Sequence, residues 1–212
     1  MKDGVKIPRF LAWARDYFFP FLTSQGPKRL YFFVIYTILS PNLPKLTMKK
    51  FRIEVKWGIL FFLSGLAWMA LEKNLGWHDR LIEQHSVYTL LYAPIAILIY
   101  VFALLEKKRK TYSGSMTYIQ GLLSGFVLTL IVVLLTPLSQ YISHSLISPA
   151  YFSNVIQLTV NSGKMTLVEA EGYFNLMNYI TQSLLFATVM GLLTTAVVMI
   201  FLRSSPRVDL PE

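Results

Sequence analysis

The sequence of 212 residues contains no cysteine, and it has little charge of either sign. Without cysteine there is no disulfide framework, no thiolate nucleophile and no cysteine-based metal site. Charged residues make up 15% of the chain, against about 25% in ordinary soluble domains. Hydrophobic residues make up 54%, and the mean hydropathy is +0.50. This composition is typical of a membrane protein rather than of a soluble domain.

Charge is missing altogether from four long intervals, and this absence predicts membrane spans. No Asp, Glu, Lys or Arg occurs at 57–71, 86–105, 111–163 or 172–202. The hydrocarbon core of a bilayer is about 30 Å thick, so a helix needs about 20 residues to cross it. We expect one span in each interval, and the first span must begin near residue 51 to reach this length. The predicted fold class is all-α: an integral membrane four-helix bundle with an outer helical hairpin between spans three and four.

The limits of the later spans follow from the same reasoning. The second span is expected at 86–105, the third at about 118–141 and the fourth at about 177–202. Two prolines, Pro94 and Pro137, lie inside the second and third of these ranges. A proline removes a helical hydrogen bond, so we expect a kink at each of them.

Lysine and arginine are distributed unevenly around the predicted spans, and the excess marks the cytoplasmic side. Eleven of these residues flank the spans on the side of the amino terminus, and three lie on the other side. The densest group on the first side is the run Lys107, Lys108, Arg109 and Lys110, which follows span two. The sequence therefore predicts a multi-pass protein of the cell inner (cytoplasmic) membrane with both termini in the cytoplasm.

A nucleic-acid partner is the other interpretation of the basic residues. The formal net charge is +9, which on a soluble protein would favour binding to phosphate groups. The only dense cluster is a run of four residues directly after a span, and it offers no extended basic face. We therefore expect the lipid bilayer as the partner and no nucleic acid.

The segment between spans three and four is longer than a simple turn, and we expect it to form the outer helical hairpin. Ser148 precedes a proline, a pair typical of a helix start, and the sequence NSG at 161–163 is typical of a helix end. Thr166 and Glu169 have the spacing of a capping box, in which two side chains satisfy free N–H groups at a helix start. The second helix of the hairpin is expected to continue through Tyr173 into span four.

The chain outside the four-span unit of 48–207 consists of residues 1–47 and a tail at 208–212. The longest apolar run before Met48 is Leu30–Ser40, which as a helix would cover only about 16 Å. Two interpretations stay open for residues 1–47. They form an interfacial segment, since basic and aromatic residues suit the headgroup layer, or natural translation begins at Met48.

Several features from Met48 onward carry a family resemblance. The sequence MKK precedes an apolar first span, the second span ends in a basic run, and GSMTYIQG at Gly114–Gly121 leads into span three. A hairpin segment follows, and Arg203 and Arg207 form a basic end after span four. In these features the chain resembles a bacterial family of small four-span membrane proteins known only as domain of unknown function four-one-nine-nine. The resemblance implies an integral membrane protein with no known activity, and it carries over no catalytic residues.

Small residues form two faces at helical spacing within the predicted spans. Gly121, Ser124 and Gly125 form one face in span three, and Ala187 and Gly191 form another in span four. Small residues let helix backbones approach closely inside a membrane. We interpret these residues as helix-packing positions that join spans three and four within one chain. Formation of a homo-oligomer through one of these faces is the alternative.

Histidine is scarce, and all three histidines are predicted at the outer side. His78 and His85 are seven residues apart, so on a helix they would share a face, with Asp79 and Glu83 nearby. His144 lies at the end of span three. Imidazole and carboxylate together suit zinc or copper. The spacings are not those of a dedicated site, and nothing in the sequence fixes a third ligand. The sequence analysis therefore assigns no metal ligand and no cofactor, and it interprets these residues as interfacial polar groups.

No constellation typical of catalysis is present. There is no glycine-rich phosphate loop, no serine triad pattern and no pair of intramembrane aspartates, so we expect no enzyme and no catalytic residue. The sequence favours a scaffold or accessory protein that contacts a membrane protein partner. The alternative is a subunit of an oligomeric channel or transporter, whose path would use the polar residues of the spans. These are Ser64, Thr129, Thr136, Gln140, Gln182 and Thr188.

Overall fold

The computed structural model describes residues 50–204, and this part of the chain is all-helical. The all-α fold class predicted from the sequence is confirmed. The predictions for residues 1–47, Arg207 and the tail at 208–212 lie outside the described residues.

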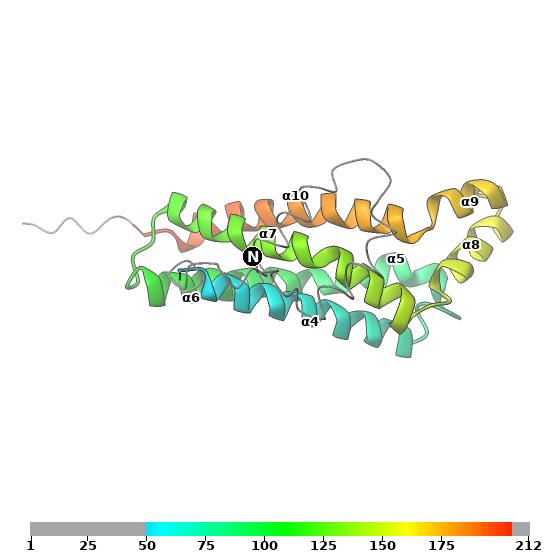
Figure 1. Ribbon diagram of the computed structural model, residues 1–212, viewed down its shortest axis with the longest axis horizontal. Coiled ribbons are helices and arrows are strands. Elements are labelled where there is room, and N and C mark those ends of the chain that lie inside the picture. Colours follow the sequence, from blue (N-terminus) through cyan, green and yellow to red (C-terminus); the bar gives the residue numbers. More distant parts are fainter. Residues whose placement is uncertain (1–49, 205–212) are drawn as a thin grey trace, which may run out of the picture. The chain divides into compact units, whose positions relative to one another are not determined.

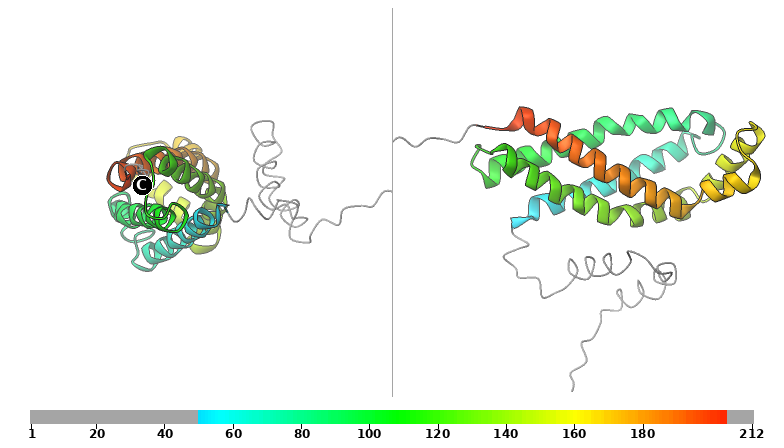
Figure 2. Two further views of the ribbon diagram at one scale, coloured as in Figure 1. Left: turned by 90° about the vertical axis from the view of Figure 1, so that its left-hand side faces the viewer. Right: turned by 90° about the horizontal axis from the view of Figure 1, so that it is seen from above.

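Four long helices run side by side through the described part (Figures 1 and 2). They are α4 (Arg52–Asn74), α6 (Ala93–Thr111), α7 (Tyr118–Ile142) and α10 (Leu176–Leu202). With the short turns that adjoin α6 and α7, they give four stretches long and apolar enough to cross a membrane. These candidate spans indicate a multi-pass membrane protein.

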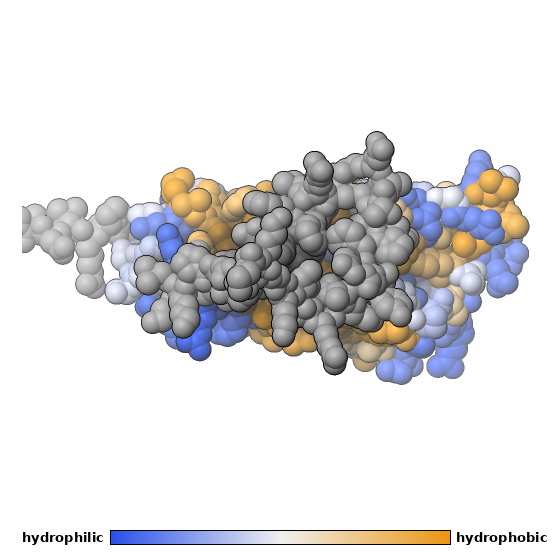
Figure 3. Space-filling view, in the orientation of Figure 1, coloured by the Kyte–Doolittle hydropathy of each residue, from blue (hydrophilic) through white to orange (hydrophobic). Residues whose placement is uncertain are grey.

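The outward faces of the long helices are apolar, as a lipid environment requires. Large side chains such as Leu63, Phe126, Leu185 and Val189 are each more than half exposed. Where the surface is visible in Figure 3, hydrophobic residues show above and below the middle of the view, and most of the hydrophilic ones lie towards the two ends. A continuous apolar surface of this kind is not stable in water, and it is the expected surface of helices in a bilayer.

Helix α7 is the central element, since it packs against α10, α4 and α6. One buried apolar cluster joins α6 to α7, and a second joins α6, α10 and the loop before α7. The first cluster contains Tyr100, Ala103, Leu128 and Val132, and the second contains Leu104, Met116, Val198 and Met199.

The small residues of α7 and α10 lie where these helices contact each other. A Cβ atom added at Gly125 would lie 2.1 Å from Cγ2 of Thr195, and one at Gly121 would lie 2.2 Å from Sδ of Met199. From α10, a Cβ atom at Gly191 would lie 2.6 Å from Oγ1 of Thr129. The two backbones approach closely because these positions have no side chain.

The other two small residues have different neighbours. Ser124 points to α4, where its hydroxyl donates a hydrogen bond of 2.7 Å to Glu54. Ala187 of α10 packs against the cluster of Tyr100 and Leu128.

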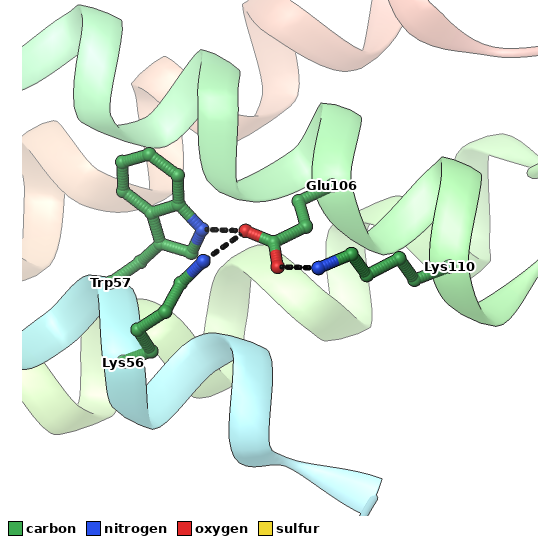
Figure 4. A network of polar contacts seen from close by, with 4 residues as sticks. All are labelled: Lys56, Trp57, Glu106 and Lys110. Atoms are coloured by element: carbon green, nitrogen blue, oxygen red, sulfur yellow. Dashed lines mark hydrogen bonds and ion pairs between the residues drawn. The ribbon is translucent and has the colours of Figure 1, made fainter.

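The ends of the long helices differ in their polar residues. We call the end that holds Lys56, Glu106 and the run Lys107–Lys110 the charged end. The opposite end holds α8 (Tyr151–Asn161) and α9 (Leu167–Tyr173), and we call it the hairpin end. At the charged end, Glu106 accepts hydrogen bonds from Lys56, Trp57 and Lys110, which joins α4 to α6 (Figure 4).

The hairpin is present, but its first helix begins later than predicted. The sequence placed the helix start at Ser148, whereas α8 begins at Tyr151. Ser148 has φ −134° and ψ 69°, and its carbonyl accepts a turn hydrogen bond of 3.2 Å from the N–H of Tyr151. The proline after Ser148 therefore lies in a turn before the helix. The predicted helix end is present, because α8 ends at Asn161 and Gly163 adopts φ +67°.

The second half of the hairpin is two helices rather than one. The predicted capping box is present, since Thr166 accepts from the N–H of Glu169 and Glu169 accepts from the N–H of Thr166. The prediction that this helix continues into span four was wrong. α9 ends at Tyr173, and Asn175 then caps α10 by accepting a hydrogen bond of 3.0 Å from the N–H of Asn178. An asparagine cap is favoured where a new helix starts.

Of the two prolines, Pro137 lies inside a long helix as expected and Pro94 does not. Pro94 occupies the first turn of α6, directly after the 3-10 turns η2 (Ile82–Gln84) and η3 (Thr89–Tyr92) and the short helix α5 (His85–Tyr88). The predicted kink within a single span at this point is thus replaced by a helix start, where proline's missing N–H costs no hydrogen bond. Pro137 does lie inside α7, and a π-helical turn, η4 (Ser143–Ile147), follows that helix.

Candidate site: a polar pocket with a histidine cluster at the hairpin end

A cavity of about 780 Å³ lies between the long helices in the half of the molecule towards the hairpin end. The pocket is lined by aromatic and small residues such as Phe61, Tyr100 and Gly191. Glu72, His85 and other polar side chains also line it. A cavity of this size is typical of a small-molecule site, and it combines an apolar lining with a few polar groups.

One polar wall of the pocket is formed by α7, η4 and α10. Gln140 donates a hydrogen bond of 2.8 Å from Nε2 to Oγ of Ser183, and its Oε1 lies 3.1 Å from Nε2 of His144. Thr136 and Gln182 line the same cavity. Polar side chains within spans cost free energy unless they are paired, so their concentration here marks a candidate functional site.

Three side chains that could hold a metal ion, Glu72, His78 and His85, lie together at the outer end of the pocket, and two of them, Glu72 and His85, line it. Their nearest donor atoms all lie within 4.8 Å of one another. The carboxylate of Glu72 is 2% exposed, and its Oε2 lies 3.3 Å from Nε2 of His78, which is fully buried. The rings of His78 and His85 pack edge to face with centroids 4.9 Å apart. We call these three residues the His–Glu cluster.

The hairpin is attached directly to this cluster. The ring of Tyr151, at the start of α8, lies 5.2 Å from the rings of both His78 and His85. Asn154 donates hydrogen bonds of 2.9 Å to the carbonyl of His78 and to the carboxylate of Asp79. Burial, together with the neighbouring hydroxyl of Tyr179, raises the pKa of Tyr151, so its phenol stays protonated at neutral pH. The position of the hairpin and the geometry of the cluster are therefore coupled.

A second buried polar group lies at the charged end, and the sequence analysis missed it. Glu54 and Lys107 form an ion pair of 2.8 Å, and their side chains are 2% and 5% exposed. Ser124 donates to the same carboxylate oxygen of Glu54, and Lys107 also donates to the carbonyl of Lys50. The burial of Glu54 was not predicted, because Glu54 lies three residues before the charge-free interval that predicted span one. This pair joins α4, α6 and α7.

The polar residues predicted for a transport path are only partly brought together. Thr136, Gln140 and Gln182 lie at the pocket, as described above. Thr129 and Ser64 instead bond to the tyrosines of α6 and η3, respectively, at 3.0 and 2.8 Å. Thr188 is exposed and donates to the carbonyl of Leu184 in its own helix.

His78 and His85 lie close together, but not because they share a helix face as the sequence suggested. His78 lies in the turn after α4 and His85 starts α5, so the two do not share one helix face. Asp79 pairs with Asn154 instead of the histidines, and Glu83 is exposed. The carboxylate that joins them is Glu72, in the last turn of α4. In the sequence, Gly76 indicates the turn that brings His78 back to Glu72. In the structure Gly76 has a φ of +79°, which lets the chain reverse there.

Comparison with known proteins agrees with the resemblance noted in the sequence. No curated protein and no solved structure gave a significant match. The profile of one family, described as proteins of unknown function (DUF4199), matches residues 56–204. Because the match covers most of the chain and includes all or most of each candidate span, this protein belongs to the DUF4199 family.

Proposed function

We propose that this protein is a non-catalytic accessory protein of the bacterial inner membrane that contacts a membrane protein partner through its hairpin end. In this proposal the charged end faces the cytoplasm, because it carries the run Lys107–Lys110 and most of the other lysine and arginine residues. The hairpin of α8 and α9 then lies on the outer side of the membrane.

The exposed apolar surface of α9 is the observation that carries this proposal. Val168 is 80% exposed and Leu167 is 54% exposed, and both lie outside the four candidate spans. Exposed apolar residues on a segment outside the membrane spans are typical of a surface that contacts another protein. The small-residue faces of α7 and α10 suit it less, since Gly121 and Gly125 already contact residues of α10 within the chain.

Photo-crosslinking in native membranes tests this proposal. A photoreactive phenylalanine analogue is placed at Val168, and the matched control is Phe201 of α10, which is also 80% exposed but lies on a candidate span. We expect a discrete protein adduct from position 168 and none from position 201. An adduct with twice the mass of the chain would identify a second copy as the partner. Lipid adducts alone from both positions would refute the accessory role.

The pocket supports a second candidate function, that of a subunit in an oligomeric channel or transporter. The supporting observation is the polar wall formed by Gln140, Ser183 and Gln182 inside the candidate spans. Reconstitution of the purified protein in liposomes tests this alternative. Solute or ion flux that is lost on Gln140→Leu or Gln182→Leu would favour transport over the accessory role.

A further inference from the structure

We propose that Glu72, His78 and His85 form a binding site for a transition-metal ion of the zinc type. This inference does not depend on the proposed accessory role, because it concerns side chains inside the molecule rather than the surface of the hairpin.

The spacing of the cluster is the first argument. Ligand atoms about 2.0 Å from a tetrahedral zinc ion lie about 3.3 Å from each other. The distance from Oε2 of Glu72 to Nε2 of His78 is 3.3 Å, which is long for a charge-assisted hydrogen bond but matches an edge of such a tetrahedron. His85 completes the group, since its ligand atom lies within 4.8 Å of those of Glu72 and His78.

Unsatisfied nitrogen atoms are the second argument. Within residues 50–204, Nδ1 of His78, His85 and His144 is buried and has no hydrogen-bond partner, and of these three only His78 and His85 belong to the group with Glu72. A buried polar atom without a partner costs about 1–3 kcal/mol. Two neighbouring imidazoles that each have such an atom are poorly satisfied by protein groups alone. A bound cation would use the lone pair of one nitrogen on each ring; on His78 this is Nε2, which faces Glu72, so the cation would leave Nδ1 of His78 without a partner.

The surroundings of Glu72 are those of a metal ligand. Nε1 of Trp68 donates a hydrogen bond of 2.8 Å to Oε1 of Glu72, which orients the carboxylate and leaves Oε2 directed to the histidines. Hydrogen bonds of this kind hold metal ligands in position. Two imidazoles and one carboxylate suit zinc and related ions, whereas magnesium and calcium prefer oxygen ligands alone.

Three protein ligands leave a fourth position for water or a ligand from the cavity. Glu72 and His85 both line the pocket, so the open side of the ion would face it. The ion would also hold the turn of His78 against α4. Because Asn154 and Tyr151 contact this turn, metal binding would fix the hairpin in place.

Metal binding can be measured on the full chain, purified in detergent without a polyhistidine tag. We expect about one zinc ion per chain by elemental analysis after dialysis, a rise in Tm on addition of zinc, and no such rise with magnesium. Cobalt in place of zinc should give the visible absorption bands of a four-coordinate site. Wild-type protein that is folded yet binds no zinc would overturn the proposal.

Variants locate the ion within the chain. Glu72→Gln and His85→Gln should each weaken zinc binding at least about tenfold, and Trp68→Phe should weaken it about 10–100-fold through the lost hydrogen bond to the ligand. His144→Gln is the matched control, since His144 lies in the same aromatic cluster but outside the group of three. We expect His144→Gln to bind zinc as the wild type does. Equal loss in His144→Gln, or full binding by His85→Gln, would refute the assignment. His85 is half-buried at the start of α5, so its substitution tests the site even where Glu72→Gln prevents folding.

Discussion

Single residues at the charged end illustrate how a charge is kept inside a membrane protein. Glu54 and Lys107 are both almost fully buried, and Nζ of Lys107 lies 2.8 Å from Oε1 of Glu54. Removal of one partner from a buried pair leaves an uncompensated charge, which typically costs about 3–5 kcal/mol. We therefore expect Glu54→Leu and Lys107→Met each to lower the Tm strongly, measured by the fluorescence of the four tryptophans in detergent.

The double variant is the control for this prediction. Replacement of both charges by apolar groups removes the unpaired charge and is often neutral. The double variant should therefore recover most of the Tm that either single variant loses. Additive losses in the double variant would show that the two residues act independently.

Some of these residue-scale features were readable from the sequence and others were not. Thr166 and Glu169 were, because a capping box is local and its two members lie at a fixed spacing. The ion pair of Glu54 with Lys107 and the group of Glu72 with His85 were not, since their members come from different helices. Only tertiary packing brings such residues together, and the sequence alone gave no register for it.

The capping box at α9 makes a prediction about pH. Hydrogen bonds from the backbone and the side chain of Thr166 lower the pKa of Glu169 below its usual value. A group whose pKa is lowered by folding stabilises the folded form above its ordinary pKa, near 4.5, and this contribution is lost as the pH falls through the lowered pKa. Amide exchange in α9, corrected for the intrinsic rate, should therefore show less protection below about pH 4 than at pH 7.

A glutamine at the same position separates this effect from general acid unfolding. Glu169→Gln keeps the hydrogen-bond acceptor of the capping box but does not titrate. Its protection in α9 should change little over the same pH range. A decrease of equal size in Glu169→Gln would assign the effect to other groups.

Helix packing makes a prediction at the scale of elements. α7 and α10 contact each other through positions without side chains, and a Cβ atom at Gly125 would overlap Thr195. Gly125→Ala should therefore destabilise the protein by about 1–3 kcal/mol through overpacking. Gly172→Ala in α9 is the matched control, because no atom lies within 4 Å of the added Cβ and alanine favours a helix. We expect a lower Tm for Gly125→Ala and an unchanged or higher Tm for Gly172→Ala.

Across elements, the sequence predicted the long helices well and the connections less well. Hydrophobic length determines a span, so α7 and α10 lie within a residue or two of their predicted limits. The break between α9 and α10 was missed, because the apolar pattern continues through Tyr173 while Asn175 starts a new helix. Pro94 lies within a candidate span as predicted, but in the first turn of α6 and not inside one continuous helix, because apolar 3-10 turns form the start of that span. In each case the apolar pattern is continuous and the local backbone is not.

The orientation proposed for the molecule in the membrane rests on the asymmetry of its basic residues, most of which, within residues 50–204, lie at the charged end. The absence of cysteine makes this orientation testable with single cysteines in a cysteine-free chain. Asn161 ends α8 at the hairpin end, and Thr111 ends α6 at the charged end. In intact spheroplasts, an impermeant thiol reagent should label a cysteine at 161 and should label one at 111 only after the membrane is permeabilised. Labelling of 111 but not of 161 in intact spheroplasts would mean that the charged end faces outward. The hairpin and its His–Glu cluster would then lie on the cytoplasmic side, where the partner proposed for α9 would have to be sought.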